Sequence, residues 1–433
     1  MVRPITAKRL LKTVRSGFEQ IADHRAANGR ISLSDALMSG FGMFSLKDSS
    51  LLEFDERRSK DQNLKQIYML KDVPSDSQLR TILDPVSPEG IKPIFKEVYQ
   101  VVKQNGVLEQ LKFVGHYLVS VDGSGYFSSK TIHCGNCLER KNSKTGEITY
   151  HHQLLAGAIV HPDQETVVPL APEPIIKQDG ETKNDCERNA AKRFMAQLRA
   201  DHPDEPFIIT EDALSANAPH LKELKKHNLR FILGVKAGDH AFLFEQVAQA
   251  HQAGQTTDYE VSHQGVTHRF RFINQVPLNA ANQEVLVNFI EYWEIKGDKV
   301  QHFCCASRTD LTVTKLNVFE LMRGGRARWK IENETFNTLK NQGYHFEHNY
   351  GHGQQNLSVN FALLMMLAFL VDQVQQLAFP LFQAVLKKEG SRKRLWQHLR
   401  ALFYTLEFAS LEDIFRALLY GYQVEGVVIF GPT

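Results

Sequence analysis

A short apolar run that ends in an acid, VSVDG at residues 119–123, decides the fold class of this chain. A second run of the same kind, IITED at residues 208–212, follows later. Each has the apolar character of a buried strand, and each ends in an aspartate, Asp122 or Asp212. Because ligands of open α/β sheets bind at the carboxyl ends of strands, both carboxylates are expected at one cleft. Alone, either aspartate is more simply explained as a turn residue or a helix cap.

Strands and helices alternate around these two runs. Further apolar runs at residues 154–160 and 230–235 are typical of buried strands. Residues 184–200 and 219–227 have the composition of helices. Because strands that alternate with helices indicate a layered α/β arrangement, the sequence predicts an α/β fold with a central sheet.

The rest of the chain is predicted to add helical regions and an inserted β region. Before the first apolar run, large apolar residues from Leu33 to Phe44 recur at helical spacing. Residues 266–272 instead alternate apolar and polar side chains, as strands do. The predicted domains are a helical N-terminal domain at 1–112, an α/β domain at 113–245 and 311–355, an inserted β region at 246–310 and a helical C-terminal region at 356–433.

The composition is that of an ordinary folded protein rather than a disordered or secreted one. Hydrophobic residues make up 42% of the 433 residues and charged residues 23%. Five cysteines are too few and too unevenly spaced for a disulfide framework, which favours a reducing cytoplasm. The N-terminus lacks the apolar segment of a secretory signal. The most apolar run, residues 361–371, is too short to cross a bilayer, so we expect a buried core helix there and no membrane partner.

A third acid lies in RWKIE, residues 328–332. Arg328 and Glu332 are four residues apart and therefore share one face of a helix. This spacing lets the Glu332 carboxylate point into a cleft with the guanidinium of Arg328 beside it. A surface ion pair between the two residues is the plainer explanation of this stretch alone. Glu334 is the alternative to Glu332 as the acid that faces the cleft.

Taken together, three motifs resemble those of insertion-sequence DDE transposases of the IS-four type. They are DGSGYFSS at residues 122–129, the strand that ends in Asp212, and RWKIE at residues 328–332. The resemblance covers residues 114–350 and includes a β-rich insertion between the second aspartate and the glutamate. It implies a ribonuclease-H-like catalytic domain in which Asp122, Asp212 and Glu332 hold two Mg²⁺ ions, with Mn²⁺ as a substitute. Two such ions can activate a nucleophile and stabilise the leaving oxygen of a phosphodiester.

The chain departs from that family's signature at two positions. The signature is a tyrosine, an arginine three residues later, the glutamate four after that, and a lysine seven after the glutamate. Arg328 and Glu332 match, but Gly325 stands at the tyrosine position and Lys340 comes eight residues after Glu332. The resemblance implies DNA contacts by Arg328, by Lys340 and by Trp293, an aromatic residue placed to hold a base pulled from the duplex. Ordinary packing in the inserted β region is the alternative for Trp293.

A Cys-x-x-Cys motif, Cys134 and Cys137, offers two thiol ligands for a structural Zn²⁺. Because structural zinc takes four ligands from cysteine and histidine, further ligands must come from nearby residues. The candidates are His133, His151, His152 and Cys186. Thiols without a metal are the alternative.

The resulting prediction is a bacterial DNA transposase that cleaves the terminal inverted repeats of a transposon and transfers the strands to target DNA. Because two ends are cut together, the resemblance implies a homodimer on DNA, within the cytoplasm and its nucleoid. Residues 1–112 are expected to contribute to DNA binding, since the first fifteen residues are basic and contain no acid. The basic residues are Arg3, Lys8, Arg9, Lys12 and Arg15.

Two other functions remain open from the sequence. A nuclease of the same fold would cleave DNA without joining it, because cleavage and strand transfer use the same three acids. A domesticated DNA-binding protein would keep the fold without catalysis, although the presence of all three acids argues against decay.

Overall fold

The chain divides into two units, one of residues 1–107 with 339–433 and one of residues 108–338. We call them the helical unit and the sheet unit. The structure, a computed structural model, describes residues 4–25, 29–58, 61–177 and 186–422. Arg3 of the basic cluster and Asn184, the expected start of a helix, lie outside the described residues.

The sheet unit is built on a mixed sheet with β2 (His116–Ser129) at its centre. On one side β2 pairs antiparallel with β4 (Ile148–His161), which pairs antiparallel with β5 (Gln164–Pro169). On the other side β2 pairs parallel with β7 (Phe207–Thr210), and β7 pairs parallel with β8 (Arg230–Gly234). The strands predicted from the apolar runs are β2, β4, β7 and β8, so the predicted α/β class is confirmed.

Three shorter strands complete this part of the sheet. They are β1 (Lys112–Phe113) beside β2, and β3 (Leu138–Lys141) and β6 (Glu173–Ile175), which both pair with β4.

The inserted region extends the same sheet from its β8 edge. Its last strand pairs antiparallel with β8, with Ser307 opposite Ile232. The segment forms an antiparallel meander in the order β8-β12-β11-β10-β9. It contains α9 (Ala241–Gln252), β9 (Thr257–His263), β10 (Val266–Pro277), β11 (Leu286–Lys296) and β12 (Lys299–Ser307). The first residues of the region predicted at 246–310 are therefore helical, and its strands begin at Thr257.

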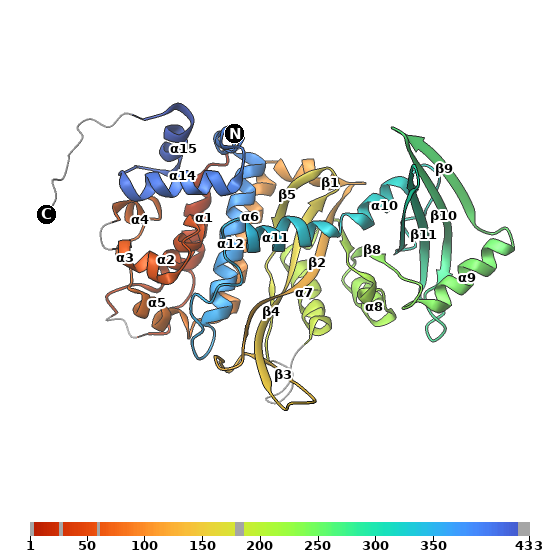
Figure 1. Cartoon of the computed structure of the whole chain (residues 1–433), viewed down its shortest axis with the longest axis horizontal. Helices are drawn as coiled ribbons and strands as arrows, with labels where there is room; N and C mark the ends of the chain where they lie inside the picture. The colour runs from red at the N-terminus through yellow and green to blue at the C-terminus, as the bar shows by residue number, and fades with distance from the viewer. Residues whose placement is uncertain (1–3, 26–28, 59–60, 178–185, 423–433) are drawn as a thin grey trace. The chain divides into compact units, whose positions relative to one another are not determined.

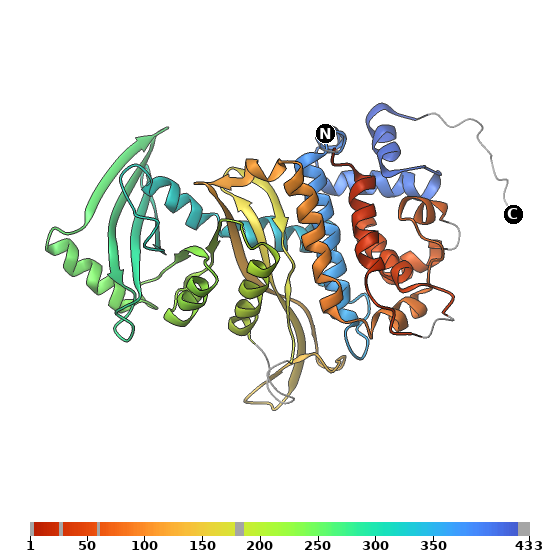
Figure 2. The same cartoon turned by 180° about the vertical axis from the view of Figure 1, so that it is seen from behind.

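Helical segments cover opposite faces of the central strands (Figures 1 and 2). On one face, α7 (Glu187–Asp201) packs so closely that a Cβ on Gly157 of β4 would lie 2.2 Å from the Phe194 ring. The other helix on this side is α8 (Ala218–Lys226). The opposite face carries α10 (Val318–Arg326) and the short π-helix η4 (Ile331–Phe336), which contacts β2, β4 and β5.

The helical unit combines helices from both ends of the chain, which the sequence analysis treats as separate regions. Hydroxyl side chains of Thr6, Ser32 and Ser75 cap the first, second and fifth helices. α12 packs against α2 and α6, so both ends of the chain share one core. The helices are α1 (Ala7–Glu19), α2 (Leu33–Leu46), α3 (Leu51–Arg58), α4 (Gln62–Ile67), α5 (Asp76–Leu83), α6 (Lys92–Gln104), α12 (Leu357–Ala378), α13 (Pro380–Glu389), α14 (Arg392–Thr405) and α15 (Leu411–Tyr420).

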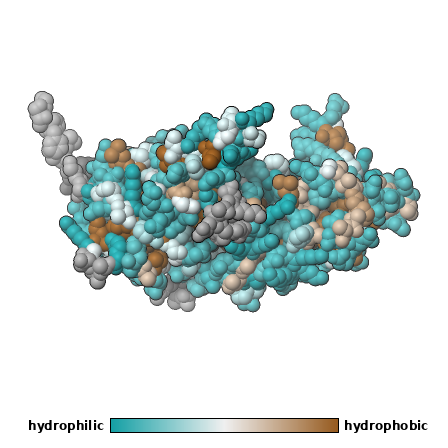
Figure 3. Space-filling model, turned by 90° about the horizontal axis from the view of Figure 1, so that it is seen from below, coloured by the Kyte–Doolittle hydropathy of each residue, from teal (hydrophilic) through white to brown (hydrophobic). Residues whose placement is uncertain are grey.

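The helix α12 contains the predicted core helix at residues 361–371 but is longer, at 22 residues. By length and composition alone it could cross a membrane, and the residues of its most apolar window are all buried in the structure. A helix that is apolar on every side is typical of a protein core as well as of a membrane span. The face drawn in Figure 3 is mainly hydrophilic and carries small hydrophobic patches.

Buried ion pairs join the N-terminal and C-terminal helices of this unit. The fully buried Lys47, at the end of α2, pairs with Asp372 of α12 and donates a hydrogen bond of 2.8 Å to the Ser45 carbonyl. Burial lowers the pKa of Lys47 to about 8, against the opposing effect of the Asp372 carboxylate.

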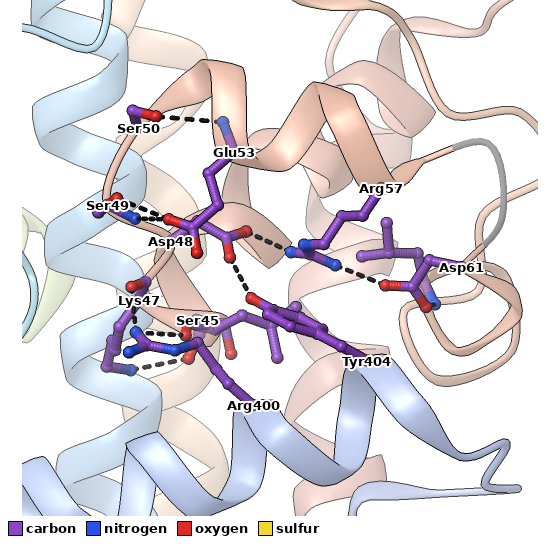
Figure 4. Close-up of polar contacts among 12 residues, drawn as sticks. Ser45, Lys47, Asp48, Ser49, Ser50, Glu53, Arg57, Asp61, Arg400 and Tyr404 are labelled. Atoms are coloured by element: carbon purple, nitrogen blue, oxygen red, sulfur yellow. Dashed lines mark hydrogen bonds and ion pairs between the residues drawn. The ribbon is translucent and has the colours of Figure 1, made fainter. Parts of the chain in front are cut away.

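A second buried network lies beside this pair (Figure 4). Arg57 of α3 lies between Asp48 and Asp61 and pairs with both. The hydroxyl of Tyr404 on α14 donates to Asp48. These contacts fasten the C-terminal helices to the N-terminal ones through charged groups that are mostly buried, the most exposed being Arg57 at 15%.

Replacing Lys47 by Met is expected to destabilise the helical unit by about 3–5 kcal/mol, because it leaves the buried Asp372 carboxylate without its cation. The matched control is Arg416→Met. Arg416 is 57% exposed and pairs with Asp413 on the same helix, so this loss should cost less than about 1 kcal/mol. Urea unfolding followed by circular dichroism measures both variants. Equal shifts of the unfolding midpoint would contradict the assignment of Lys47 as a structural ion.

Candidate active site

Two aspartates extend from the same level of adjacent parallel strands. Ser120 of β2 is in register with Thr210 of β7. Asp122 and Asp212 each lie two residues further on, at the carboxyl end of the parallel pairing. Both aspartates line one cleft of about 810 Å³. The structure therefore brings them together as the strand-end pattern predicts.

Hydrogen bonds to the backbone orient both carboxylates. Oδ1 of Asp122 accepts from the N–H of Gly123 at 2.8 Å. Oδ1 of Asp212 accepts from the N–H of Leu214 at 2.9 Å and caps the short 3₁₀-helix η3 (Ala213–Ser215). Asp212 is thus a helix cap as well as a cleft residue. Its neighbour Glu211 is buried and forms an ion pair with His220 at 2.5 Å. Of these two acids, only Glu211 has an ion-pair partner among the described contacts.

The third acid is held against the sheet by two hydroxyl groups. Ser120 Oγ donates to the Arg328 carbonyl at 2.8 Å, and Thr210 Oγ1 donates to the Gly325 carbonyl at 3.4 Å. Both hydroxyl residues are buried. Because they belong to the same rung of the sheet, they fix the segment from Gly325 to η4 relative to both aspartates.

Two glycines let α10 approach the sheet closely. A Cβ on Gly324 would lie 2.8 Å from the Phe113 ring, and one on Gly325 would lie 3.1 Å from Ile232 and 3.2 Å from Phe303. Any side chain at position 325 would require Ile232 and Phe303 to move. The glycine that replaces the signature's tyrosine therefore has a steric reason.

Arg328 links the third acid to the first. Its Nη1 lies 2.6 Å from Oε1 of Glu332 and 3.9 Å from Oδ2 of Asp122. The expected pairing of residues 328 and 332 is therefore present. Glu334 instead lines a different pocket, together with Tyr292 and Glu294. This placement favours Glu332 over Glu334 as the acid nearest to Asp122.

The segment around Glu332 is a π-helix rather than the regular α-helix assumed from the sequence. Trp329, expected on the apolar side, is 52% exposed and its ring contacts the Arg328 guanidinium, whereas Phe336 is buried. Single π-helical turns are frequent at functional sites.

A fourth acid, Glu187, was missed by the sequence analysis. It is the first residue of α7 and lines the same cleft as Asp122 and Asp212. A Cβ on Gly123 would lie only 2.3 Å from Glu187 Oε1, so glycine at position 123 makes room for this carboxylate. Burial is the first cause that raises the pKa of Glu187, and the charge of Asp212 adds to it. The only sequence signal for this acid was the glycine that follows Asp122, and a glycine there is equally well explained by a turn.

Acidic side chains gather around Asp122, although Arg188 and Lys192 also line the cleft. Burial is the main cause that raises the pKa of Asp122 to about 6, and the negative charges of Glu332 and Glu187 act in the same direction. The Gly123 N–H and the Arg328 guanidinium act against them. Carboxylate oxygens that repel one another are the ligand set that suits a hard divalent cation. The oxygen donors of Asp122, Asp212 and Glu332 are of the type that Mg²⁺ or Mn²⁺, the ions implied by the resemblance, prefers.

The other two residues expected to contact DNA lie in different surroundings. Lys340 belongs to the helical unit, where its Nζ pairs with Glu347 at 2.8 Å. Trp293 lies on β11 and stacks on His302, with ring centroids 5.2 Å apart. The guanidinium carbon of Arg271 lies over the Trp293 ring, 5.7 Å from its centroid. Each side chain thus has a packing partner inside its own unit.

Replacing Asp122 by Asn is expected to stabilise the metal-free protein at about pH 8 by roughly 1–2 kcal/mol, after discounting for partial exposure. An acid with a raised pKa stabilises the fold only while protonated. That contribution is present below about pH 4 and is lost as the pH rises through about 6. The gain in Asp122→Asn should therefore vanish near pH 4.

The test is urea unfolding with a chelator present at both pH values. Asp239→Asn, at an exposed position, serves as the control and should change little. A variant less stable than the wild type at about pH 8 would contradict the electrostatic picture of the cleft.

Comparisons with known proteins agree with the geometry. No curated protein matches this chain at the significance required. Residues 129–370, more than half of the 433 residues, match the family described as the transposase DDE domain. The matched span contains Asp212 and Glu332 and begins seven residues after Asp122. The chain therefore belongs to the transposase DDE domain family.

Proposed function

We propose that this protein is a DNA transposase that cuts DNA at transposon ends and joins the strands to target DNA, with Asp122, Asp212 and Glu332 as ligands of the catalytic metal. Membership of the family implies a DNA substrate and a nuclease and strand-transfer activity. The observation that carries the assignment of the site is that Asp122 and Asp212 line one cleft while Arg328 links Glu332 to Asp122. Arg328 contacts two of these acids.

The strand order supports a ribonuclease-H-like catalytic domain of the IS-four type. Three antiparallel strands, β5, β4 and β2, are followed by the parallel strands β7 and β8. The β9–β12 meander lies in the sequence between Asp212 and Glu332. This is the position of the β-rich insertion in the transposases that the sequence resembles.

Divalent metal at these acids would supply activation of a water or a 3′-hydroxyl and stabilisation of the leaving oxygen. The chain's own residues set the conditions. Asp122 must be deprotonated to act as a ligand, so metal affinity should increase as the pH rises past about 6. Arg328 holds Glu332 in place and offers the remaining N–H groups of its planar guanidinium to a phosphate. Glu187 adds negative charge beside Asp212.

DNA contacts by the helical unit remain part of the proposal. Lys8 and Lys12 on α1 are exposed, whereas Arg15 is buried and pairs with Glu19 and Asp35. Phosphate binding by this helix would therefore use the lysines rather than Arg15. Because two ends must be cut together, we also propose a dimer on DNA, acting in the bacterial cytoplasm.

Replacing any one of the three acids by its amide should reduce DNA cleavage by more than about 100-fold, because each change removes a charged metal ligand and keeps the shape. The variants are Asp122→Asn, Asp212→Asn and Glu332→Gln. Cleavage of labelled element ends in Mg²⁺ measures the loss, and a gel-shift assay checks that DNA is still bound.

Glu334→Gln is the matched control, since Glu334 lies two residues away and lines the other pocket. It should cleave at nearly the wild-type rate. Loss of cleavage in Glu334→Gln but not in Glu332→Gln would move the catalytic glutamate by two residues. Normal cleavage by all three amide variants would refute the proposed mechanism.

Replacing Arg328 by Lys should slow cleavage by roughly 10-fold or more, because a compact ammonium lacks the planar fork of donors with which the guanidinium spans Glu332, Asp122 and a phosphate. Thermal unfolding should change little, since the Ser120 hydrogen bond goes to the Arg328 backbone and not to its side chain. Wild-type rates in this variant would exclude Arg328 from the site.

Strand transfer separates transposition from the two other functions. A nuclease of the same fold would cut the labelled ends and leave them unjoined. A domesticated protein would bind the ends without cutting them. A product in which the element end is joined to target DNA is the outcome expected here.

A further inference from the structure

Two cysteines and a histidine converge in the sheet unit, apart from the four acids. Cys134 and Cys137 lie in the turn that precedes β3, and His152 lies on β4. Cys134 is 9% exposed, and Cys137 and His152 are fully buried. Figure 1 shows β3 beside β4, so the turn is carried to the strand by this pairing.

The distances between the three side chains are those of ligands on one tetrahedral ion. The sulphur atoms are 3.8 Å apart, and each lies 3.4 Å from Nε2 of His152. Zinc with Zn–S bonds of about 2.3 Å and a Zn–N bond of about 2.0 Å would place its two sulphurs about 3.8 Å apart and each sulphur about 3.5 Å from the nitrogen. The three observed separations therefore agree with a shared zinc to about 0.1 Å.

Other interactions explain this arrangement less well. A disulfide needs its sulphurs about 2.05 Å apart, whereas these two lie 3.8 Å apart. A ring nitrogen either donates one proton or accepts a hydrogen bond with one lone pair, so Nε2 of His152 can form a good hydrogen bond with one thiol at a time. A cation at the centre satisfies both sulphurs and the nitrogen together.

We propose that Cys134, Cys137 and His152 bind a structural Zn²⁺. Binding would displace the two thiol protons to solvent and leave two thiolates, whose charge the ion cancels. A neutral cluster suits a buried position, where an uncompensated charge would be costly. These residues supply three of the four ligands that structural zinc takes, and the fourth comes from outside this set.

The zinc would fix one wall of the acidic cleft. Leu138 directly follows Cys137, His151 directly precedes His152, and both line the cleft that contains Asp122. His152 is four residues along β4 from Ala156, the register partner of Asp122, which corresponds to about 13 Å of strand. The site is thus too far away to share the catalytic metal, yet it is joined to the cleft through one strand.

Metal content tests the proposal directly. Full-length protein purified without added metal should contain about one zinc per chain by elemental analysis. Cys134→Ser with Cys137→Ser, and separately His152→Asn, should lose most of it. X-ray absorption at the zinc edge should show two sulphur neighbours, and a shell of oxygen and nitrogen alone would overturn the assignment, as would a zinc content near zero.

Two control variants separate these ligands from their neighbours. Cys186→Ser removes an exposed thiol, and His151→Asn changes the residue beside His152. Both should keep the full zinc content. If either lost zinc as completely as the Cys134 and Cys137 variant, the ligand set proposed here would be wrong.

A measurement on the wild type guards against variants that fail to fold. A thiol-modifying mercurial should release the zinc, detected with a chromogenic chelator, and should lower the unfolding temperature. Restoring thiols and zinc should recover that temperature, whereas an unchanged temperature after release would refute a structural role. Glu332→Gln should retain its zinc, so failure of the catalytic proposal and failure of this one would give different results.

Discussion

Two buried hydroxyl groups on one rung of the sheet determine where the acids of the cleft meet. Ser120 and Thr210 are in register on β2 and β7, and they donate to carbonyls of the segment that leads into η4. The aspartates stand two residues beyond the same rung. A slip of one residue between the strands would turn one aspartate to the opposite face of the sheet. The geometry of the site therefore depends on strand register more than on any contact between the acids themselves.

The two units handle buried charge in opposite ways. In the helical unit Asp372 forms an ion pair with Lys47, and Asp48 forms one with Arg57, so the charges of both acids are compensated inside the protein. Around Asp122, by contrast, the carboxylates of Glu332 and Glu187 outnumber the guanidinium of Arg328, and the pKa of Asp122 is raised. The first arrangement holds the fold together. The second stores repulsion that a bound cation would relieve.

Much of this could be predicted from the sequence, because the apolar runs, the capping residues and the Arg-x-x-x-Glu spacing are local signals. The strands, the helical ends and the pairing of Arg328 with Glu332 are confirmed. Local signals could not show that α12 packs with α2, since an apolar helix does not specify its partner. They also missed the π-helix, the exposure of Trp329, and Glu187, whose place beside Gly123 depends on a helix from elsewhere in the chain.

The order of the strands also affects whether copies of this protein aggregate through the edges of their sheets. Among the described strands the sheet ends at β9, which pairs with β10 and leaves its other edge open. Open edges tend to recruit a strand from a second molecule. Here the exposed Asp258 and Glu260 alternate along β9, where they pair with Arg271 and Arg269 of β10. Two such edges brought together would set rows of like charge against each other, so the extended sheet carries its own protection against aggregation.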